Sequence, residues 1–415
     1  TAIATKIDSI DGFTATSAAA VVTVTSTTGE AVELSAVDDS VATDNGTGTV
    51  SAYTNVEFSN MAGTETVNVY SGNIVTTGLK DASGTSDALT FNLATLAADK
   101  GFNHTVADIV VANVESVTLD SSGMTAGKTN TLSALSGDAT LTSLTITGDS
   151  NLTITDHASD NSKLATINAS ALTGDLTLSD SVGSLAQTIT TGSGNDTIVM
   201  GANLTAADVI DAGANTVLTT GLAGKDSLTA TINATGTTTT AAALSIANVE
   251  TITLNTATAA SVINAAGITG ASVINIEHDQ NVTISNLAAG IELGLGATAG
   301  GTDDEYTGTL TVTLADETGT ADALTVNIAD TSGNDTTATL KTTAIETITI
   351  ATATGEAHNS IVDMTGALAT TINVTGATST GNIDLDTLST STITVDASSF
   401  GGTLDVTAST ADTTI

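Results

Sequence analysis

Apolar and polar residues alternate along most of the chain. The segments Leu141–Asp156, Gly308–Asp316 and Ser391–Ser398 contain runs in which Leu, Ile or Val alternates with Thr. Successive side chains of a β-strand point to opposite faces, so this period of two predicts strands with one buried face. No apolar run approaches the ~20 residues that a membrane-spanning helix requires. The apolar stretch Ala18–Thr25 is therefore predicted to be a strand.

Helical patterns are few and short. Three segments, 93–100, 204–213 and 241–248, combine alanine and leucine in a way that is typical of helices. The sequence therefore predicts short helical interruptions in a chain of strands.

A longer repeat underlies the alternation. Asn-Val-Glu followed by strand residues begins at Asn55, Asn113 and Asn248, with a degenerate copy at Ala344. An Asp-x-Leu-Thr strand precedes three copies, and its aspartate lies 28, 24 and 24 residues before the glutamate in the pairs Asp87–Glu115, Asp226–Glu250 and Asp322–Glu346. Such an interval is too long for a hairpin and fits one turn of a coil with parallel strands. We therefore expect Leu89 beside Val117, Leu228 beside Ile252 and Leu324 beside Ile348, with Asn113 and Asn248 at coil corners.

A second repeated pattern indicates two strands joined by a bend of small residues. It occurs at Ile167–Leu178, Ile263–Ile274 and Val395–Val406, and each copy carries a glycine suited to a positive-φ corner. Together the repeats predict an all-β fold of β-solenoid, or parallel β-helix-like, modules. We divide the chain into a β module at 1–83 and solenoid modules at 84–190, 191–301 and 302–415.

The composition supports extended structure. The 415 residues include neither proline nor cysteine and very few aromatic residues. A chain without proline suits strands whose N–H groups are bonded in ladders, and a chain without cysteine has no disulfide or thiol chemistry. Disorder is the alternative for so much Thr, Ser, Gly and Asp, but the persistent apolar alternation argues against it.

The charge excludes one class of partner. The formal net charge is −38, and all seven basic residues are lysines. Nucleic-acid binding needs clustered basic charge, so it is not expected. Self-repulsion of this size opposes a compact fold unless cations neutralise it, and divalent cations are suited to that task.

The segment Thr191–Val199, TGSGNDTIV, carries the most specific chemistry. It fits the nonapeptide Gly-Gly-x-Gly-x-Asp-x-apolar-x of calcium-binding β-helices, with threonine in place of the first glycine. Glycines at 192 and 194 allow a tight loop that presents carbonyl groups, Asp196 supplies a carboxylate oxygen, and Ile198 is expected in the core. Ca²⁺ takes about six to eight oxygen ligands, so one nonapeptide is part of a site.

Further ligands are expected downstream. Asp211 lies in the segment Ala207–Asn215, and Gly221, Gly224 and Asp226 repeat the nonapeptide spacing ahead of Leu228. The alternative is that these residues are ordinary Gly, Asn and Asp turns between strands.

The pair of nonapeptides, followed by DSLTATIN and NVETITL, resembles bacterial surface-layer proteins of the RTX-bearing, type I-secreted kind. The resemblance in composition and repeats extends over most of the chain. It implies β-solenoids that bind several Ca²⁺ ions and self-assemble into a two-dimensional lattice on a Gram-negative cell. It also implies that Gly192, Gly194, Asp196, Gly221, Gly224 and Asp226 are calcium-loop positions.

Other acidic loops are weaker candidates for calcium. Asp303 and Asp304 lie between glycines in the segment 301–308, and Asp38, Asp39 and Asp44 are arranged similarly. The segment 331–339 contains a partial nonapeptide. Each of these can equally be a solvated acidic loop.

No catalytic constellation is recognisable. The four histidines, His104, His157, His278 and His358, are dispersed without metal-ligand spacing, and there is no nucleophile elbow or cysteine nucleophile. We expect a non-enzymatic, secreted protein of the bacterial cell surface, with copies of itself as its main partner. Surface polysaccharide or lipopolysaccharide would bind through a region outside this chain, and membrane insertion is not expected. A secreted repeat adhesin or filament subunit is the alternative, and an RTX-type secreted enzyme is a more distant one.

Overall fold

The structure is a computed structural model that describes residues 13–18, 21–26, 54–69, 73–93, 101–137, 139–157, 161–179, 185–215, 225–232, 239–256, 260–277, 280–296, 306–328, 336–352, 359–376, 381–408 and 414. Every regular element in these ranges is a β-strand. Contacts divide the chain into two compact units, one of residues 1–199 and 210–224, the other of residues 200–209 and 225–415. The finer division into four modules stays a prediction.

Fifteen complete strands lie in the described residues of the first unit. They are β1 Phe13–Ala18, β2 Val21–Ser26, β3 Thr54–Met61, β4 Thr66–Val69, β5 Asn73–Leu79, β6 Ala88–Leu93, β7 His104–Val106, β8 Asp108–Val110, β9 Ser116–Ser121, β10 Thr129–Ser136, β11 Ser143–Gly148, β12 Asn151–Asp156, β13 Thr166–Leu172, β14 Leu176–Leu178 and β15 Thr188–Thr190. Strands β16 (Thr197–Gly201) and β17 (Val209–Asp211) straddle the division between the units.

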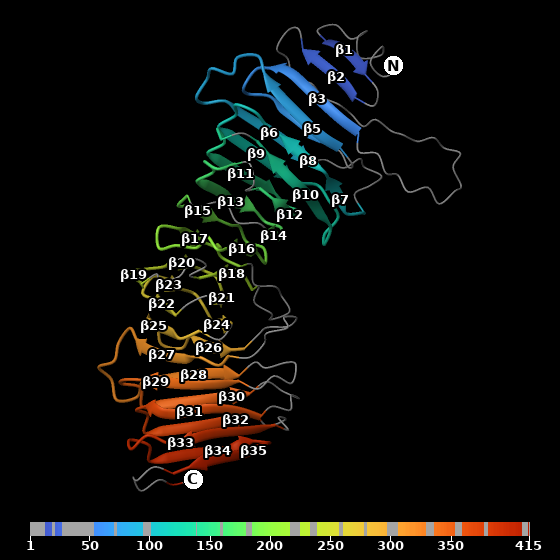
Figure 1. Cartoon of the computed structure of the whole chain (residues 1–415). Coiled ribbons are helices and arrows are strands. Elements are labelled where there is room, and N and C mark those ends of the chain that lie inside the picture. The colour runs from blue at the N-terminus through green and yellow to red at the C-terminus, as the bar shows by residue number, and fades with distance from the viewer. Residues whose placement is uncertain are drawn as a thin grey trace. The chain divides into compact units, whose positions relative to one another are not determined.

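Stacked parallel strands build this unit. On one face β4, β6, β9, β11, β13 and β15 pair in that order. Figure 1 shows the succession from β6 to β15. On another, β10 pairs with β7 and β12, and β12 with β14. Strands β1 and β2 are antiparallel, and β2, β3, β5 and β8 then pair in parallel. Each coil thus contributes one strand to each face, which is the arrangement of a β-solenoid.

In the second unit, the part that the structure describes has eighteen complete strands. They are β18 Ser227–Thr231, β19 Thr239–Ala243, β20 Ser245–Ala247, β21 Thr251–Asn255, β22 Ser261–Asn264, β23 Ile268–Thr269, β24 Val273–Glu277, β25 Val282–Leu287, β26 Glu292–Leu295, β27 Thr309–Leu314, β28 Ala323–Ile328, β29 Thr337–Thr342, β30 Thr347–Thr352, β31 Asn359–Ala367, β32 Thr371–Gly376, β33 Asn382–Thr387, β34 Thr394–Phe400 and β35 Thr403–Thr407.

This unit is also a parallel solenoid. One sheet stacks β18, β21, β24, β26, β28, β30, β32 and β34, and a second stacks β19, β22, β25, β27, β29, β31, β33 and β35 (Figure 1). The alternation of apolar and polar residues in the sequence becomes an alternation of burial. In β28, for example, Leu324, Val326 and Ile328 are buried and the residues between them are not. The predicted all-β solenoid is confirmed.

The register predicted from the repeat is confirmed as well. Leu89 pairs with Val117, Leu228 with Ile252 and Leu324 with Ile348, each between parallel strands. All six side chains are buried, so identical positions of successive coils pack on one another. The repeat length in the sequence is therefore the length of a coil.

The predicted corners lie where the repeat places them. Asn113 and Asn248 fall just before β9 and β21 and have φ angles of 57° and 58°. Asparagine tolerates this left-handed conformation better than most residues. The copy at Asn55 differs, because Asn55 lies inside β3 and the positive φ of that coil falls at Asn60, at 64°.

The second repeated pattern forms the expected strand, bend and strand in all three copies, β13–β14, β22–β24 and β34–β35. Its glycines have two different roles. Gly270 has a φ of +83°, as predicted. A Cβ on Gly174 would instead lie 2.5 Å from the backbone carbon of Ser150, so this glycine is required by the close approach of the neighbouring coil.

Two of the predicted helices are wrong. Residues 204–213 form a turn and strand β17, and residues 241–248 contribute to β19 and β20. Ile210, Leu244 and Ile246 are buried by stacking on neighbouring coils, and this tertiary burial outweighs the helix propensity of alanine. In the third segment, Leu93 ends β6 and residues 94–100 lie outside the described ranges. Nothing in the part of the chain that the structure describes forms a helix able to cross a membrane.

Candidate calcium-binding loops

The loop from Thr191 to Asp196 connects β15 with β16 and rests directly on the coil before it. A Cβ on Gly192 would lie 1.8 Å from the carbonyl oxygen of Leu172, and one on Gly194 would lie 2.5 Å from that of Gly174. Real Cβ atoms do not approach so closely, so neither position accepts a side chain without moving backbone. The two glycines are explained by coil stacking as well as by the nonapeptide pattern.

Asp196 turns its carboxylate into the protein. The residue is 1% exposed, and its Oδ1 accepts a hydrogen bond of 2.7 Å from the backbone N–H of Leu176 in the preceding coil. Ile198, two residues on, is 1% exposed and occupies the core as predicted. Asp196 thus ties its loop to the coil on which the loop rests.

The electrostatics of Asp196 reflect this burial. Desolvation raises the pKa of its carboxyl group, and the nearby carboxylate of Asp175 adds to the rise. Hydrogen bonds from Thr191 and from the backbone N–H of Leu176 and Gly192 lower the pKa in part. The ionised form is therefore disfavoured in the fold, and a cation nearby would relieve that cost.

Asp175 extends a ladder of short polar side chains at the same corner. Its Oδ1 accepts from the backbone N–H of Asn195 at 2.8 Å, and its Oδ2 accepts from Nδ2 of Asn151 at 3.0 Å. In return, the backbone N–H of Asp175 donates to Oδ1 of Asn151 at 3.0 Å. The side chains of Asn151 and Asp175 thus join three successive coils. The carboxylates of Asp175 and Asp196 both lie in this region.

The segment that contains Asp211 lies against the first residue of the nonapeptide, Thr191. The backbone N–H of Thr191 donates to the carbonyl oxygen of Asp211 at 2.9 Å, and the Thr191 hydroxyl donates to that of Ala212 at 2.9 Å. The Asp211 carboxylate accepts from the N–H of Gly213 at 3.0 Å, an Asx-turn. The segment predicted to complete the loop therefore stacks on it.

The second nonapeptide is described only in part. Gly221 and Gly224 lie outside the described residues, as do Asp303 and Asp304 and the acidic segments at 38–44 and 331–335. Asp226 and Leu228 are both fully buried, and Leu228 occupies the core as predicted. Among the residues that the structure describes, no three histidine or acidic side chains gather closely enough to hold a metal ion.

The repeated aspartates and glutamates have a role that the sequence alone did not reveal. The backbone N–H of the aspartate donates to Oε2 of the glutamate one coil later, at 2.8 Å for Asp87–Glu115, 2.7 Å for Asp226–Glu250 and 2.9 Å for Asp322–Glu346. The aspartate carbonyl accepts from the residue after that glutamate, at 3.0 Å in all three coils. The spacing of 24 to 28 residues between aspartate and glutamate was the sequence signal for this bond, because donor and acceptor lie one coil apart.

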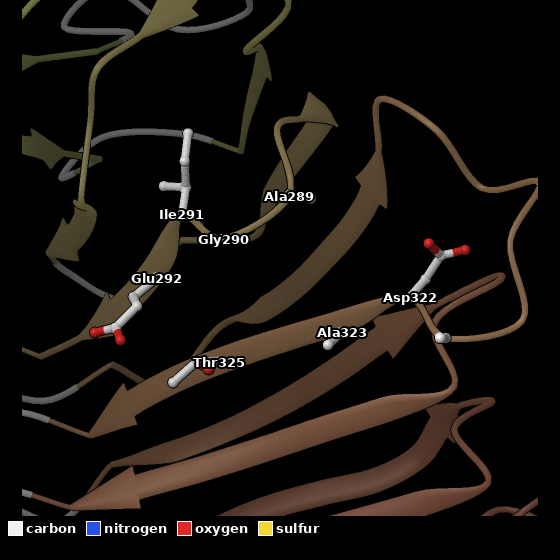
Figure 2. Close-up of a pocket in the computed structure, with 8 residues that line it drawn as sticks. Ala289, Gly290, Ile291, Glu292, Asp322, Ala323 and Thr325 are labelled. Atoms are coloured by element: carbon white, nitrogen blue, oxygen red, sulfur yellow. The ribbon is translucent and has the colours of Figure 1, made fainter.

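A pocket of about 230 Å³ lies in the second unit, between the turn that precedes β26 and the start of β28. Glu292 and Asp322 are its acidic lining residues, but Figure 2 shows their carboxylates pointing away from each other. Glu292 accepts from Nδ2 of Asn327 at 2.6 Å. The pocket therefore does not bring two carboxylates together on one ligand.

No family model and no curated protein matches this chain. The functional interpretation therefore rests on its own residues and geometry.

His157 gives the first unit a dependence on pH. Burial lowers its pKa to about 4 from an ordinary value of 6.5, with a smaller opposing effect of Asp156. The folded state holds this histidine neutral. Its contribution to the free energy of unfolding is therefore fully present above pH 6.5 and is lost as the pH falls towards 4. We expect His157 to cost about 3 kcal/mol of stability across that range.

The measurement compares His157→Leu with the unaltered chain by urea unfolding at pH 7 and pH 4. Carboxyl groups elsewhere in the protein titrate in the same pH range. The difference in unfolding free energy between the two proteins therefore isolates the effect of the histidine. A difference that stays constant with pH would contradict the assignment.

Proposed function

We propose that this chain is a structural, non-enzymatic protein that self-assembles with Ca²⁺ into a two-dimensional layer on a bacterial cell surface. The observation that carries the proposal is the stacking of acidic coil corners in a chain of net charge −38. At Thr191–Asp196 this stacking places Asp175 near a buried Asp196 and brings Asp211 onto the loop. Such a chain needs cations to remain compact and to approach its own copies.

Calcium would act by neutralising carboxylates at these corners. Asp196, Asp211 and Asp226 would supply side-chain oxygens, and the glycine positions 192, 194, 221 and 224 would present carbonyl oxygens. Asp303 and Asp304 would form a further site. Several bound ions would stiffen the coils and bridge neighbouring molecules, because hard cations prefer such oxygen ligands.

A secreted adhesin or filament subunit is the second candidate. Stacked solenoid coils of this kind also suit a protein that grows along one axis, since each coil contacts chiefly its neighbours. Electron microscopy separates the two, because a layer extends in two directions and a filament in one. Attachment to a surface polysaccharide or lipopolysaccharide would use a region outside this chain.

The decisive experiment is removal of calcium from assembled protein. We expect ordered arrays to form in Ca²⁺ and to dissolve into monomers after chelation, with a weaker β-sheet signal in circular dichroism. Sodium chloride at matched ionic strength is the control for simple charge screening. Arrays that persist after exhaustive chelation would sink the calcium mechanism, and protein that never assembles would sink the layer itself.

The variant Asp196→Asn tests one of the proposed calcium ligands directly. We expect Ca²⁺ to raise the stability of this variant less than that of the unaltered chain. Asp81→Asn is the matched control, because Asp81 is exposed and accepts hydrogen bonds from the backbone N–H and the hydroxyl of the nearby Ser83. Equal calcium responses in both variants would remove Asp196 from the proposed ligands.

A further inference from the structure

Two hydroxyl groups in the core of the second unit have no hydrogen-bond partner among the described residues. They are Oγ1 of Thr336 and Oγ of Ser360, and both residues are 0% exposed. Buried polar groups are nearly always hydrogen-bonded, because an unpartnered one carries the full cost of its desolvation. Two such groups on adjacent coils therefore point to a ligand that both of them bind.

The two residues occupy the same inward position of adjacent coils. Each directly precedes one member of the in-register pair formed by Thr337 of β29 and Ile361 of β31. The backbone N–H of Ile361 donates to the carbonyl oxygen of Thr336 at 2.7 Å, which fixes this register. The two hydroxyl groups thus belong to neighbouring strands of one parallel sheet (Figure 1).

The spacing of these strands suits a bridged contact better than a direct one. Neighbouring strands lie about 4.8 Å apart, whereas an O–H···O hydrogen bond is about 2.8 Å long. One atom that makes such a bond to each of two oxygens at the strand spacing joins them at an angle of roughly 120°. This angle is near the tetrahedral geometry of a water molecule.

The neighbouring side chains leave room for a small ligand. In the two following coils the same inward position is occupied by Ile383 and Leu404, which are larger than serine and threonine. The backbone ladders hold the coils at a fixed distance, so the smaller side chains are not compensated by a closer approach. The next inward residue along β29 is the small Ala338, and the buried Tyr306 closes the upstream side.

We propose that Thr336 and Ser360 bind one internal water molecule, which bridges their hydroxyl groups and links the coils of β29 and β31. A water molecule donates and accepts hydrogen bonds, so it satisfies a hydroxyl group in either orientation. A metal ion is less suited to this position, because neither side chain is charged and an uncompensated charge is costly to bury. The site is independent of the proposed assembly and of its calcium ions.

The direction of a stability change tests the site. Thr336→Val replaces the hydroxyl group by a methyl group of similar size. If water bridges the two residues, the variant leaves the Ser360 hydroxyl and the water short of a partner, and we expect the unfolding constant of the second unit in urea to rise roughly tenfold. If nothing binds there, valine removes an unpartnered polar group, so a variant that is equally stable or more stable would overturn the proposal.

The matched control is Thr337→Val on the same strand, because Thr337 is exposed. This variant reports the effect of valine on strand propensity alone. We expect it to leave the unfolding constant unchanged or slightly lowered, since valine favours strands at least as well as threonine. A rise equal to that of Thr336→Val would assign the loss to the strand and overturn the proposal.

A double-mutant cycle with Ser360→Ala tests the bridge itself. We expect the double variant to be less destabilised than the sum of the two single variants, because both hydrogen bonds belong to one water molecule. NMR cross-peaks between a long-lived water and the Ala338 methyl group should appear in the unaltered chain and vanish in the double variant. Coupling without a long-lived water would show a direct bond between the hydroxyl groups, and additive effects would show no shared ligand. Either result would overturn the bridging water.

Discussion

Replacement of Phe91 by alanine is expected to destabilise the first unit by about 3–5 kcal/mol. Phe91 is fully buried in β6 and pairs in register with Val67 of β4 and Leu119 of β9. A chain with five phenylalanines and no tryptophan has few large side chains to fill such a position. Truncation leaves a cavity between two coils, and the remaining Leu, Ile and Val side chains cannot close it without shifting the ladders.

Hydrogen exchange of β6 and β9 is the suitable measurement, since it reports on these coils apart from the second unit. Phe102→Ala is the matched control in the same unit, because Phe102 is 68% exposed. We expect faster exchange in the first variant and little change in the second. Similar exchange in both would show that Phe91 does not support the stacking of these coils.

Gly192→Ala is expected to cost about 3 kcal/mol, although it adds a single methyl group. The new Cβ would lie 1.8 Å from the carbonyl oxygen of Leu172 and 3.1 Å from that of Ala169. Both neighbours are backbone atoms, so no side chain can rotate away to make room. The loop would have to lift from the preceding coil, which would also strain the hydrogen bond between Asp196 and Leu176.

Gly101→Ala is the control for this substitution. A Cβ there meets nothing within 4 Å, and alanine restricts the unfolded chain more than glycine does. We expect Gly101→Ala to be neutral or slightly stabilising in urea unfolding. A Gly192→Ala variant that is equally stable would show that the loop can lift from its neighbour at little cost.

The calcium loops show how far a local motif can be interpreted. The nonapeptide correctly placed Ile198 in the core. The segment that contains Asp211 lies against the same loop through a backbone hydrogen bond, and the role of its carboxylate as a calcium ligand stays a prediction. The sequence could not indicate that Asp196 would accept a hydrogen bond from Leu176, twenty residues earlier. That bond exists because coil stacking brings the N–H of another coil to the carboxylate.

Two of the helix predictions failed for a related reason. Alanine-rich segments favour helix when they are considered alone, but Ile210 and Leu244 gain burial only when their segments lie against neighbouring coils. Burial of this kind depends on residues more than twenty positions away. Local propensity contains no information about such neighbours.

By itself the sequence determined most of the strands, their buried faces, the length of a coil and the positions of the corners at Asn113 and Asn248. Each of these follows from a periodicity or from a conformational preference carried by the residue itself. Only the tertiary structure decided that the Glu115, Glu250 and Glu346 carboxylates bind backbone N–H groups of the preceding coil, and that Gly192 and Gly194 lie against backbone. It also decided that the outward threonines align in columns. These features arise when separate coils stack, because stacking joins atoms that the linear order keeps apart.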